Sequence, residues 1–328
     1  MSLSHRLMAL AAVLCASCSD GSGLRAPIPG DGDQGPASSG GGSFLSLVEQ
    51  APFQNAFRGT RRGELRYDPA SPVIYREDVG ADGLGKFAVD PIEVTSADNQ
   101  VVLESLLAIR QIFHYRFRDW RIKDYVLFLQ NYTWQVLDGD FIIAGVSCMR
   151  VEVVRPHTSP PSHYLVDIDP LTGMVLAWKE CDDLANVVAM AEFETFQYGG
   201  DVSGLMLVDR FFTGTTIHPI DGDLEGIFGF VPVIPTMMPT PGVTLSQDVE
   251  KMNVYGEIWA KVSMTDGLET TVFLSRAPEG SAKVQPSTVT TLSLGTWTGI
   301  EGKIGNQPVR VAGKFSPTLL ELTLESAF

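Results

Sequence analysis

Residues 143–181 read IAGVSCMRVEVVRPHTSPPSHYLVDIDPLTGMVLAWKEC. Near the start of this stretch, Met149, Val151 and Val153 alternate with charged residues. Side chains of an extended chain point alternately to opposite faces, so the alternation predicts a strand with one face in a core and the other in water. We therefore expect an antiparallel sheet to organise this part of the chain.

Three more strands are expected after this one. The turn at 169–173, Asp-Pro-Leu-Thr-Gly, has Pro and Gly at positions that a tight turn favours. It joins expected strands at 163–169 and 174–179, and a further strand is expected at 187–198. Because each strand follows the last through a short connection, the four are predicted to form a meander.

The region before this meander contains both β-like and helical patterns. Segment 57–89 alternates short β-like runs with turn residues, which predicts further antiparallel strands. In segment 96–113 the large apolar residues recur at spacings of four, three and four, which predicts a helix with one apolar face. Such a face needs a sheet to pack against. The residues of the apolar stripe are Val102, Leu106, Ile109 and Phe113.

The N-terminus is expected to be a lipoprotein signal peptide covering residues 1–18. An uninterrupted apolar run at 7–14 is too short to cross a bilayer as a mature helix. The small residues Ala16 and Ser17 precede Cys18, which is the pattern required for cleavage and lipidation at that cysteine. An ordinary signal peptide, cut after a small residue, is the alternative.

Segment 19–43 is expected to be a flexible tether, because it has almost no large apolar residue and ends in a Gly- and Ser-rich run. A lipid on Cys18 and this tether predict a cell-envelope lipoprotein that faces the periplasm and is held to a membrane by its anchor. Ser19, in place of an Asp that retains some lipoproteins at the inner membrane, favours the outer membrane.

The remaining chain is longer than most single cores, so two domains are expected. Gly and Pro are concentrated in 226–243, where we place the boundary. The predicted division is a first domain at 44–200, a linker at 201–225 and a second domain at 226–328. In the second domain we expect strands at 256–264, 270–275, 288–294 and 309–311, and a terminal helix over 316–322.

Composition and motifs argue against several classes of function. A formal net charge of −15 disfavours nucleic acid as a partner, because phosphate binding needs a basic face. The histidines include no pair at metal-ligand spacing, and nothing assembles a nucleophile, a base and an oxyanion hole. We therefore expect no enzyme activity, no cofactor and no metal site. Cys148 and Cys181 are expected on non-adjacent strands, which argues against a disulfide.

One region departs from the acidic background, with five cations interleaved with aromatic residues. Such a patch suits anionic lipid headgroups or an acidic partner segment. The alternative is a solvated helix end whose cations offset the helix dipole and nearby carboxylates. The cations are Arg110, Arg116, Arg118, Arg121 and Lys123.

The order of motifs resembles the MucB/RseB family, periplasmic regulators of the sigma-E envelope-stress response. In the first half, the matching features are a small-residue turn, a Tyr-containing strand, the turn at 169–173 and a strand with Phe. In the second half they are a Pro-rich entry, a turn of the Ser-Asp-Gly-Leu type and a closing strand, Gly and helix. These lie at 144–145, 163–167, 169–174, 188–196, 230–235, 265–268 and 309–317. Phe230 stands where the family has Trp.

The resemblance implies a mainly β (α+β) fold: an N-terminal half-open antiparallel β-barrel with helices, like that of lipoprotein carriers, and a small C-terminal antiparallel sheet with a terminal helix. It also implies a non-enzymatic sensor or regulator that binds a lipid acyl chain and a membrane anti-sigma factor or other envelope protein. A lipid or lipoprotein carrier is the alternative function.

The resembled barrel leaves an apolar cavity between helix and sheet, and methionine side chains adapt to irregular apolar ligands. We therefore expect a partly open cavity between the helical stripe and one sheet face, with a fully packed core as the alternative. The sheet residues expected to line it are Met149, Val151, Met174, Leu176 and Trp178.

Overall fold

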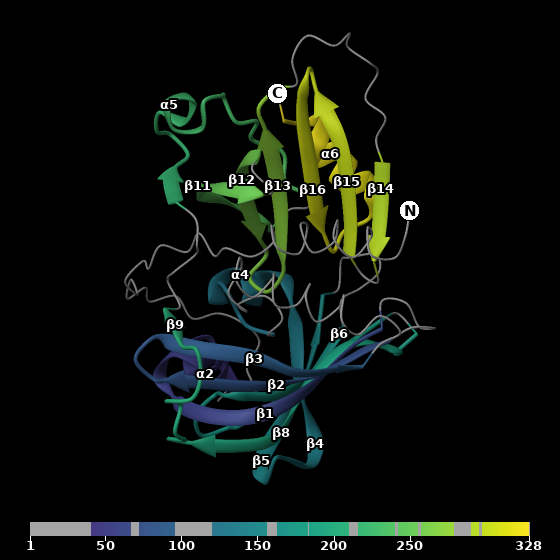
Figure 1. The fold of residues 1–328 in the computed structure, drawn as a ribbon. Helices are drawn as coiled ribbons and strands as arrows, with labels where there is room; N and C mark the ends of the chain where they lie inside the picture. The colour runs from purple at the N-terminus through teal and green to yellow at the C-terminus, as the bar shows by residue number, and fades with distance from the viewer. Residues whose placement is uncertain are drawn as a thin grey trace.

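The computed structural model describes residues 41–66, 72–95, 120–155, 163–182, 184–209, 216–239, 242–254, 257–278, 290–294 and 297–327. These residues form two antiparallel sheets, one in the lower half and one in the upper half of Figure 1. Helices pack against each sheet. The predicted mainly β architecture is confirmed.

Sheet A, the large sheet, contains nine strands in the order β4-β5-β6-β7-β8-β1-β2-β3-β9. Its first and last strands, β4 and β9, are not paired with each other in the described residues, so the sheet is open on one side, as expected for a half-open barrel. The strands are β1 (Ala56–Leu65), β2 (Val73–Asp82), β3 (Lys86–Thr95), β4 (Thr133–Ile143), β5 (Val146–Val154), β6 (His163–Ile168), β7 (Val175–Cys181), β8 (Val187–Tyr198) and β9 (Val208–Asp209). The meander predicted between 143 and 198 is confirmed.

The turn between β6 and β7 shows how the local sequence fixes this meander. The Asp169 carboxylate accepts hydrogen bonds from the Leu171 N–H and the Thr172 hydroxyl, and the Tyr198 hydroxyl also donates to it. Gly173 has φ +76°, and a Cβ at this position would come within 2.6 Å of the Leu47 backbone. Only glycine therefore allows the turn to approach the helix that carries Leu47.

Two helices cover the concave face of sheet A. Helix α2 (Gly41–Gln54) contributes Leu45 and Val48 to one core cluster and Ala51 to a second. Helix α4 (Tyr125–Asn131) contributes Phe128, which is fully buried. The helix predicted over 96–113 lies outside the described residues.

Sheet B belongs to the small domain and has the order β10-β11-β12-β13-β16-β15-β14. Its strands are β10 (Thr216–Pro219), β11 (Thr244–Val254), β12 (Glu257–Thr265), β13 (Thr270–Arg276), β14 (Thr290–Leu294), β15 (Trp297–Ile304) and β16 (Gln307–Gly313), accompanied by α5 (Leu224–Phe228) and α6 (Pro317–Glu325). Strands β11 and β15 were not predicted. The segment 201–225 contains β9, β10 and the first residues of α5.

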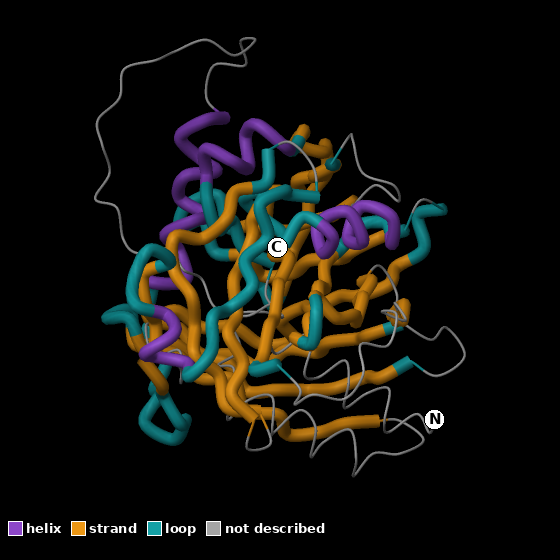
Figure 2. The backbone as a smooth tube through the Cα atoms, turned by 90° about the horizontal axis from the view of Figure 1, so that it is seen from above, coloured by secondary structure: helices purple, strands orange, loops and turns teal. Residues whose placement is uncertain are grey.

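The terminal helix starts as the sequence predicts. Ser316 occupies the N-cap position and Pro317 follows it, although the Ser316 side chain makes no capping hydrogen bond. Leu320 and Leu324 of α6 pack on one face of sheet B with Phe273 and Ile300. Viewed from above, α6 lies across the strands of the small domain beside the C-terminus (Figure 2).

Candidate functional site

The sheet residues predicted to line an apolar cavity all lie in the barrel core. Val151, Met174 and Leu176 are buried, whereas Met149 and Trp178 are partly buried. They divide between two clusters: Val151, Met149 and Trp178 belong to the first, and Met174 and Leu176 to the second. The residues of the helical stripe lie outside the described part of the chain. The cavity therefore stays a prediction.

The concave face also holds a buried ion pair, which sequence reasoning missed. Arg61 Nε lies 2.7 Å from Glu77 Oε1, and the two residues are 5% and 0% exposed. They are paired on β1 and β2, on the face that carries Phe57 and Val79 of the second core cluster. Alternation along β1 would have shown that Arg61 shares a face with Phe57. The Arg61–Glu77 pair thus lies on the same face as apolar side chains of the barrel core.

The described residues of the basic patch lie at the junction between the two domains. Lys123 donates its backbone N–H to Gly267 O at 2.7 Å and its ammonium to the Thr270 hydroxyl. Arg121 is partly buried. The other three cations lie outside the described residues. Lys123 therefore bonds the small domain, which limits its availability to another partner.

The Thr-Asp-Gly-Leu turn between β12 and β13 inserts into the barrel domain. Leu268 belongs to the core cluster of the barrel. Gly267 has φ +104°, and a Cβ there would lie 2.2 Å from the Phe128 backbone nitrogen. The turn motif that supported the resemblance is therefore a docking element, and glycine is required at its tip by both conformation and space.

A buried network of charged and phenolic groups surrounds this turn. Arg155 of the barrel domain lies 3.0 Å from Asp266, and the Tyr132 hydroxyl donates to the same carboxylate at 2.9 Å. Burial raises the pKa of Asp266 even though the Arg155 charge opposes that change. Burial, together with the nearby carboxylates of Asp266 and Glu269, also raises the pKa of Tyr132 well above its ordinary value.

The second part of the network is centred on Lys314, which follows β16. Its ammonium donates to the Tyr164 hydroxyl at 2.8 Å, to Glu180 at 2.9 Å and to Glu269 at 3.0 Å. Tyr164 also donates to Glu269. Burial favours the neutral form of Glu269, but the charges of Lys314 and Lys123 outweigh it, and the pKa of Glu269 is lowered. The network therefore joins β6 and β7 of the barrel to the small domain.

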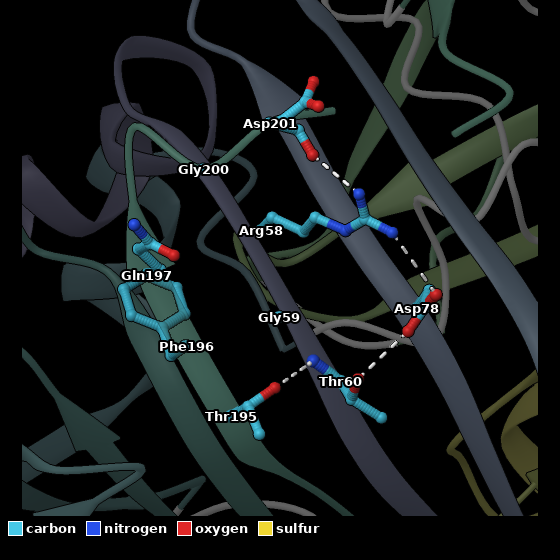
Figure 3. Close-up of a pocket in the computed structure, with 9 residues that line it drawn as sticks. All are labelled: Arg58, Gly59, Thr60, Asp78, Thr195, Phe196, Gln197, Gly200 and Asp201. Carbon is cyan, nitrogen blue, oxygen red and sulfur yellow. Dashed lines mark hydrogen bonds and ion pairs between the residues drawn. The ribbon is translucent and has the colours of Figure 1, made fainter. Parts of the chain in front are cut away.

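A separate open cleft of about 460 Å³ lies on the outer face of β1, β2 and β8 (Figure 3). Its charged groups bond one another. Arg58 donates to Asp201 O at 2.7 Å and lies 3.7 Å from Asp78, and the Thr60 hydroxyl donates to Asp78 at 3.0 Å. Arg58, Thr60 and Asp78 are therefore engaged with other groups of the protein, and the cleft does not indicate a particular ligand.

Neither cysteine of the described residues forms a disulfide, and both Cys148 and Cys181 are buried. They lie on β5 and β7, which are separated by β6, as expected. Burial raises the pKa of the Cys148 thiol to about 11. Within the described part of the chain, no cluster of three or more His, Cys, Asp or Glu side chains could hold a metal ion.

Comparison with known proteins identifies the architecture. No protein-family model matches the chain, and no curated protein matches it. Among solved structures, MucB in complex with MucA(peri) matches with a TM-score of 0.52 and 16% identity, over 87% of this chain and 97% of that chain. The chain has the fold of MucB.

Two further solved structures of MucB also match the fold of this chain. MucB alone matches with a TM-score of 0.51 and 18% identity, over 89% of this chain and 98% of that one. The MucA/MucB complex of Pseudomonas aeruginosa matches with a TM-score of 0.52 and 16% identity, over 86% and 96% of the two chains. The resemblance in the order of motifs is therefore confirmed at the level of fold.

No described helix has the combination of length and apolar composition needed to cross a membrane.

Proposed function

We propose that this chain is a non-enzymatic regulator of the cell envelope that binds a membrane anti-sigma factor or a similar envelope protein. The observation that carries the proposal is the match to MucB across both domains, including a structure in which MucB is bound to MucA(peri). A carrier that shields one acyl chain would need only the barrel, so the preserved small domain favours a protein-binding role.

The domain junction supports a regulatory role for this binding. Lys314, Glu180 and Glu269 join the two domains through a buried network, so a change in the barrel interior can be transmitted to the small domain. A lipid that binds one conformation better than another shifts the protein toward that conformation. We propose that an acyl chain in the barrel and a protein partner bind with opposite preferences.

The lipid part of the proposal depends on the barrel interior. Met149 and Trp178 pack against one core cluster of the barrel and Met174 belongs to another, and methionine side chains repack around irregular apolar ligands. The proposed anchor at Cys18 would hold the protein at the membrane where acylated molecules occur. A lipid or lipoprotein carrier is the second candidate, favoured by the same half-open barrel.

The two candidates differ in what the protein recovers from cells. The full chain with a C-terminal affinity tag should be purified from detergent-solubilised membranes and its bound proteins identified by mass spectrometry. Recovery of one predominant membrane protein supports regulation. Recovery of many different lipoproteins supports transport and contradicts the regulatory proposal.

A further inference from the structure

Strand β4 is a long exposed edge strand of sheet A in the described residues, and β3 is the other long strand with little cover, because β9 pairs with it only at Lys86 and Phe87. Strand β4 contains 11 residues, whereas the strands at the other edges, β9, β10 and β14, contain 2, 4 and 5. Among the described residues, the backbone of β4 pairs only with β5. A long edge with unpaired backbone groups is a template for another strand, and short edges largely avoid this.

The exposed side chains of β4 form a pattern with apolar ends and an acidic centre. Val136 and Ile142 are 47% and 68% exposed. Between them, the pairing register with β5 shifts at the exposed Asp138-Gly139-Asp140 segment. Neither Asp138 nor Asp140 forms an ion pair in the described part of the chain. The edge therefore offers apolar contacts on either side of two uncompensated negative charges.

We propose that β4 binds an extended segment of the protein partner as an added strand, and that this segment places a Lys or Arg opposite Asp138 and Asp140 with apolar residues on either side. In such binding, backbone hydrogen bonds provide affinity and alternate side chains provide specificity. This inference rests on the proposed function, because it names the part of the chain that contacts the partner.

A second copy of the chain is a poor occupant of this edge. Antiparallel pairing of two β4 strands about Gly139 would place Asp138 of each copy against Asp140 of the other. Like charges opposite one another in a sheet are destabilising. The same two carboxylates attract a cationic segment, so they select against self-pairing and for a basic partner.

Synthetic peptides test the added-strand geometry directly. The probe is a short fluorescent peptide of alternating Val and Thr with a central Lys, and its control has Glu in place of that Lys. Fluorescence anisotropy with the full chain should show saturable binding of the Lys peptide and much weaker binding of the Glu peptide. Two further Lys peptides carry N-methyl groups on alternate residues, one on the even positions and the other on the odd positions. Their affinities for the full chain should differ, because only one of the two sets of N–H groups faces β4.

Charge reversal on β4 tests whether the Lys peptide binds at this strand. The double variant Asp138→Lys/Asp140→Lys should weaken binding of the Lys peptide about tenfold or more, whereas Asp221→Lys/Glu225→Lys, a matched pair of exposed acids in the small domain, should not. Circular dichroism checks that both variants are folded. Absence of saturable binding, equal binding of Lys and Glu peptides, or equal loss in the two double variants would overturn the proposal.

The membrane purification separates this inference from the proposed function. If the wild-type chain recovers no predominant partner, the proposed function fails. If both the wild type and Asp138→Lys/Asp140→Lys recover the same partner in equal amounts, the proposed function stands and the role of β4 is refuted.

Discussion

Lys314 Nζ lies 2.9 Å from Glu180 Oε2, and this contact joins the small domain to strand β7 of the barrel. The two side chains are 8% and 3% exposed, so the pair is largely removed from water. A buried charge needs a partner, because desolvation without pairing costs several kcal/mol. The two domains are therefore held together by a contact whose loss removes the cation that lies between two buried carboxylates.

Lys314→Met should destabilise the protein strongly. The substitution keeps an apolar stem but leaves Glu180 and Glu269 without this cation, with an expected loss of about 3–5 kcal/mol in the free energy of unfolding. Urea denaturation followed by tryptophan fluorescence measures the loss. Lys86→Met, at an exposed site on β3, is the control and should change stability by less than about 0.5 kcal/mol. Similar values for the two variants would contradict the role of the junction.

The lowered pKa of Glu269 predicts a contribution to acid sensitivity. A carboxyl group with a folded-state pKa below its unfolded value of 4.5 stabilises the folded state above that value, and this stabilisation is lost as pH falls through the folded pKa. Glu269→Gln removes this contribution. The free energy of unfolding of the variant should therefore fall less steeply than that of the wild type below about pH 4.5.

Asp266 affects the pH dependence of stability in the opposite direction to Glu269, because its pKa is raised and not lowered. Protonation of Asp266 on acidification favours the folded state, so Asp266→Asn should make the decline below neutral pH steeper than in the wild type. Chemical denaturation at a series of pH values tests both variants. Parallel profiles for the wild type and the two variants would show that neither carboxyl group has a shifted pKa.

Gly267→Ala should cost more stability than Gly305→Ala. Both glycines have positive φ, at +104° and +60°, so both substitutions introduce backbone strain of about 1 kcal/mol or more. A Cβ at Gly267 also meets the Phe128 backbone at 2.2 Å, whereas a Cβ at Gly305 has nothing within 4 Å. Thermal unfolding of the two variants compares them. Equal losses would indicate that the β12–β13 turn does not dock tightly against α4.

The barrel cavity can be tested with tryptophan substitutions. Val151→Trp or Leu106→Trp should abolish binding of a fluorescent fatty acyl probe while the fold is kept, if the space beside them is open. In a packed core the wild type would bind no probe, and each substitution would destabilise the protein by about 1–3 kcal/mol. Leu171→Trp, at a site that is 87% exposed, is the control and should leave probe binding unchanged.

Lipidation at Cys18 is expected from the small residues before it and the tether after it. Cys18→Ala should abolish labelling by a fatty-acid analogue and release the protein from the membrane fraction. Cys148→Ala is the matched control, because that thiol is buried in the folded domain. Unchanged labelling and fractionation of Cys18→Ala would remove the basis for the anchored localisation.

The fold was predictable where local pattern and tertiary packing agree. The strands between 143 and 198 alternate apolar and polar residues, and the turn at Asp169 to Gly173 has residue types that fix its geometry. The terminal helix was recognisable from Ser316 and Pro317 for the same reason. Strands β11 and β15 were missed because charged residues and glycines, such as Glu250 and Gly302, interrupt their apolar pattern.

The candidate site was less predictable, because its residues come together only through tertiary structure. Arg155 and Asp266 are far apart in sequence, as are Glu180 and Lys314, and no local pattern indicates that either pair meets. The sequence did identify the β12–β13 turn as a motif, although not its insertion beside α4. Helix α2 was predictable in principle from Leu45, Val48 and Ala51, which recur at a spacing of three and are all buried.

In the proposed function, an acyl ligand and a membrane protein compete for this chain. The most direct measurement is recovery of the partner from detergent-solubilised membranes by the tagged full chain, with and without an added short-chain lysophospholipid. One predominant membrane protein should be recovered, and the lipid should release it in proportion to the occupancy of the barrel by lipid. No release is expected from Val151→Trp. Recovery that is independent of added lipid, while the same lipid binds the wild-type barrel, would show that the two ligands do not compete.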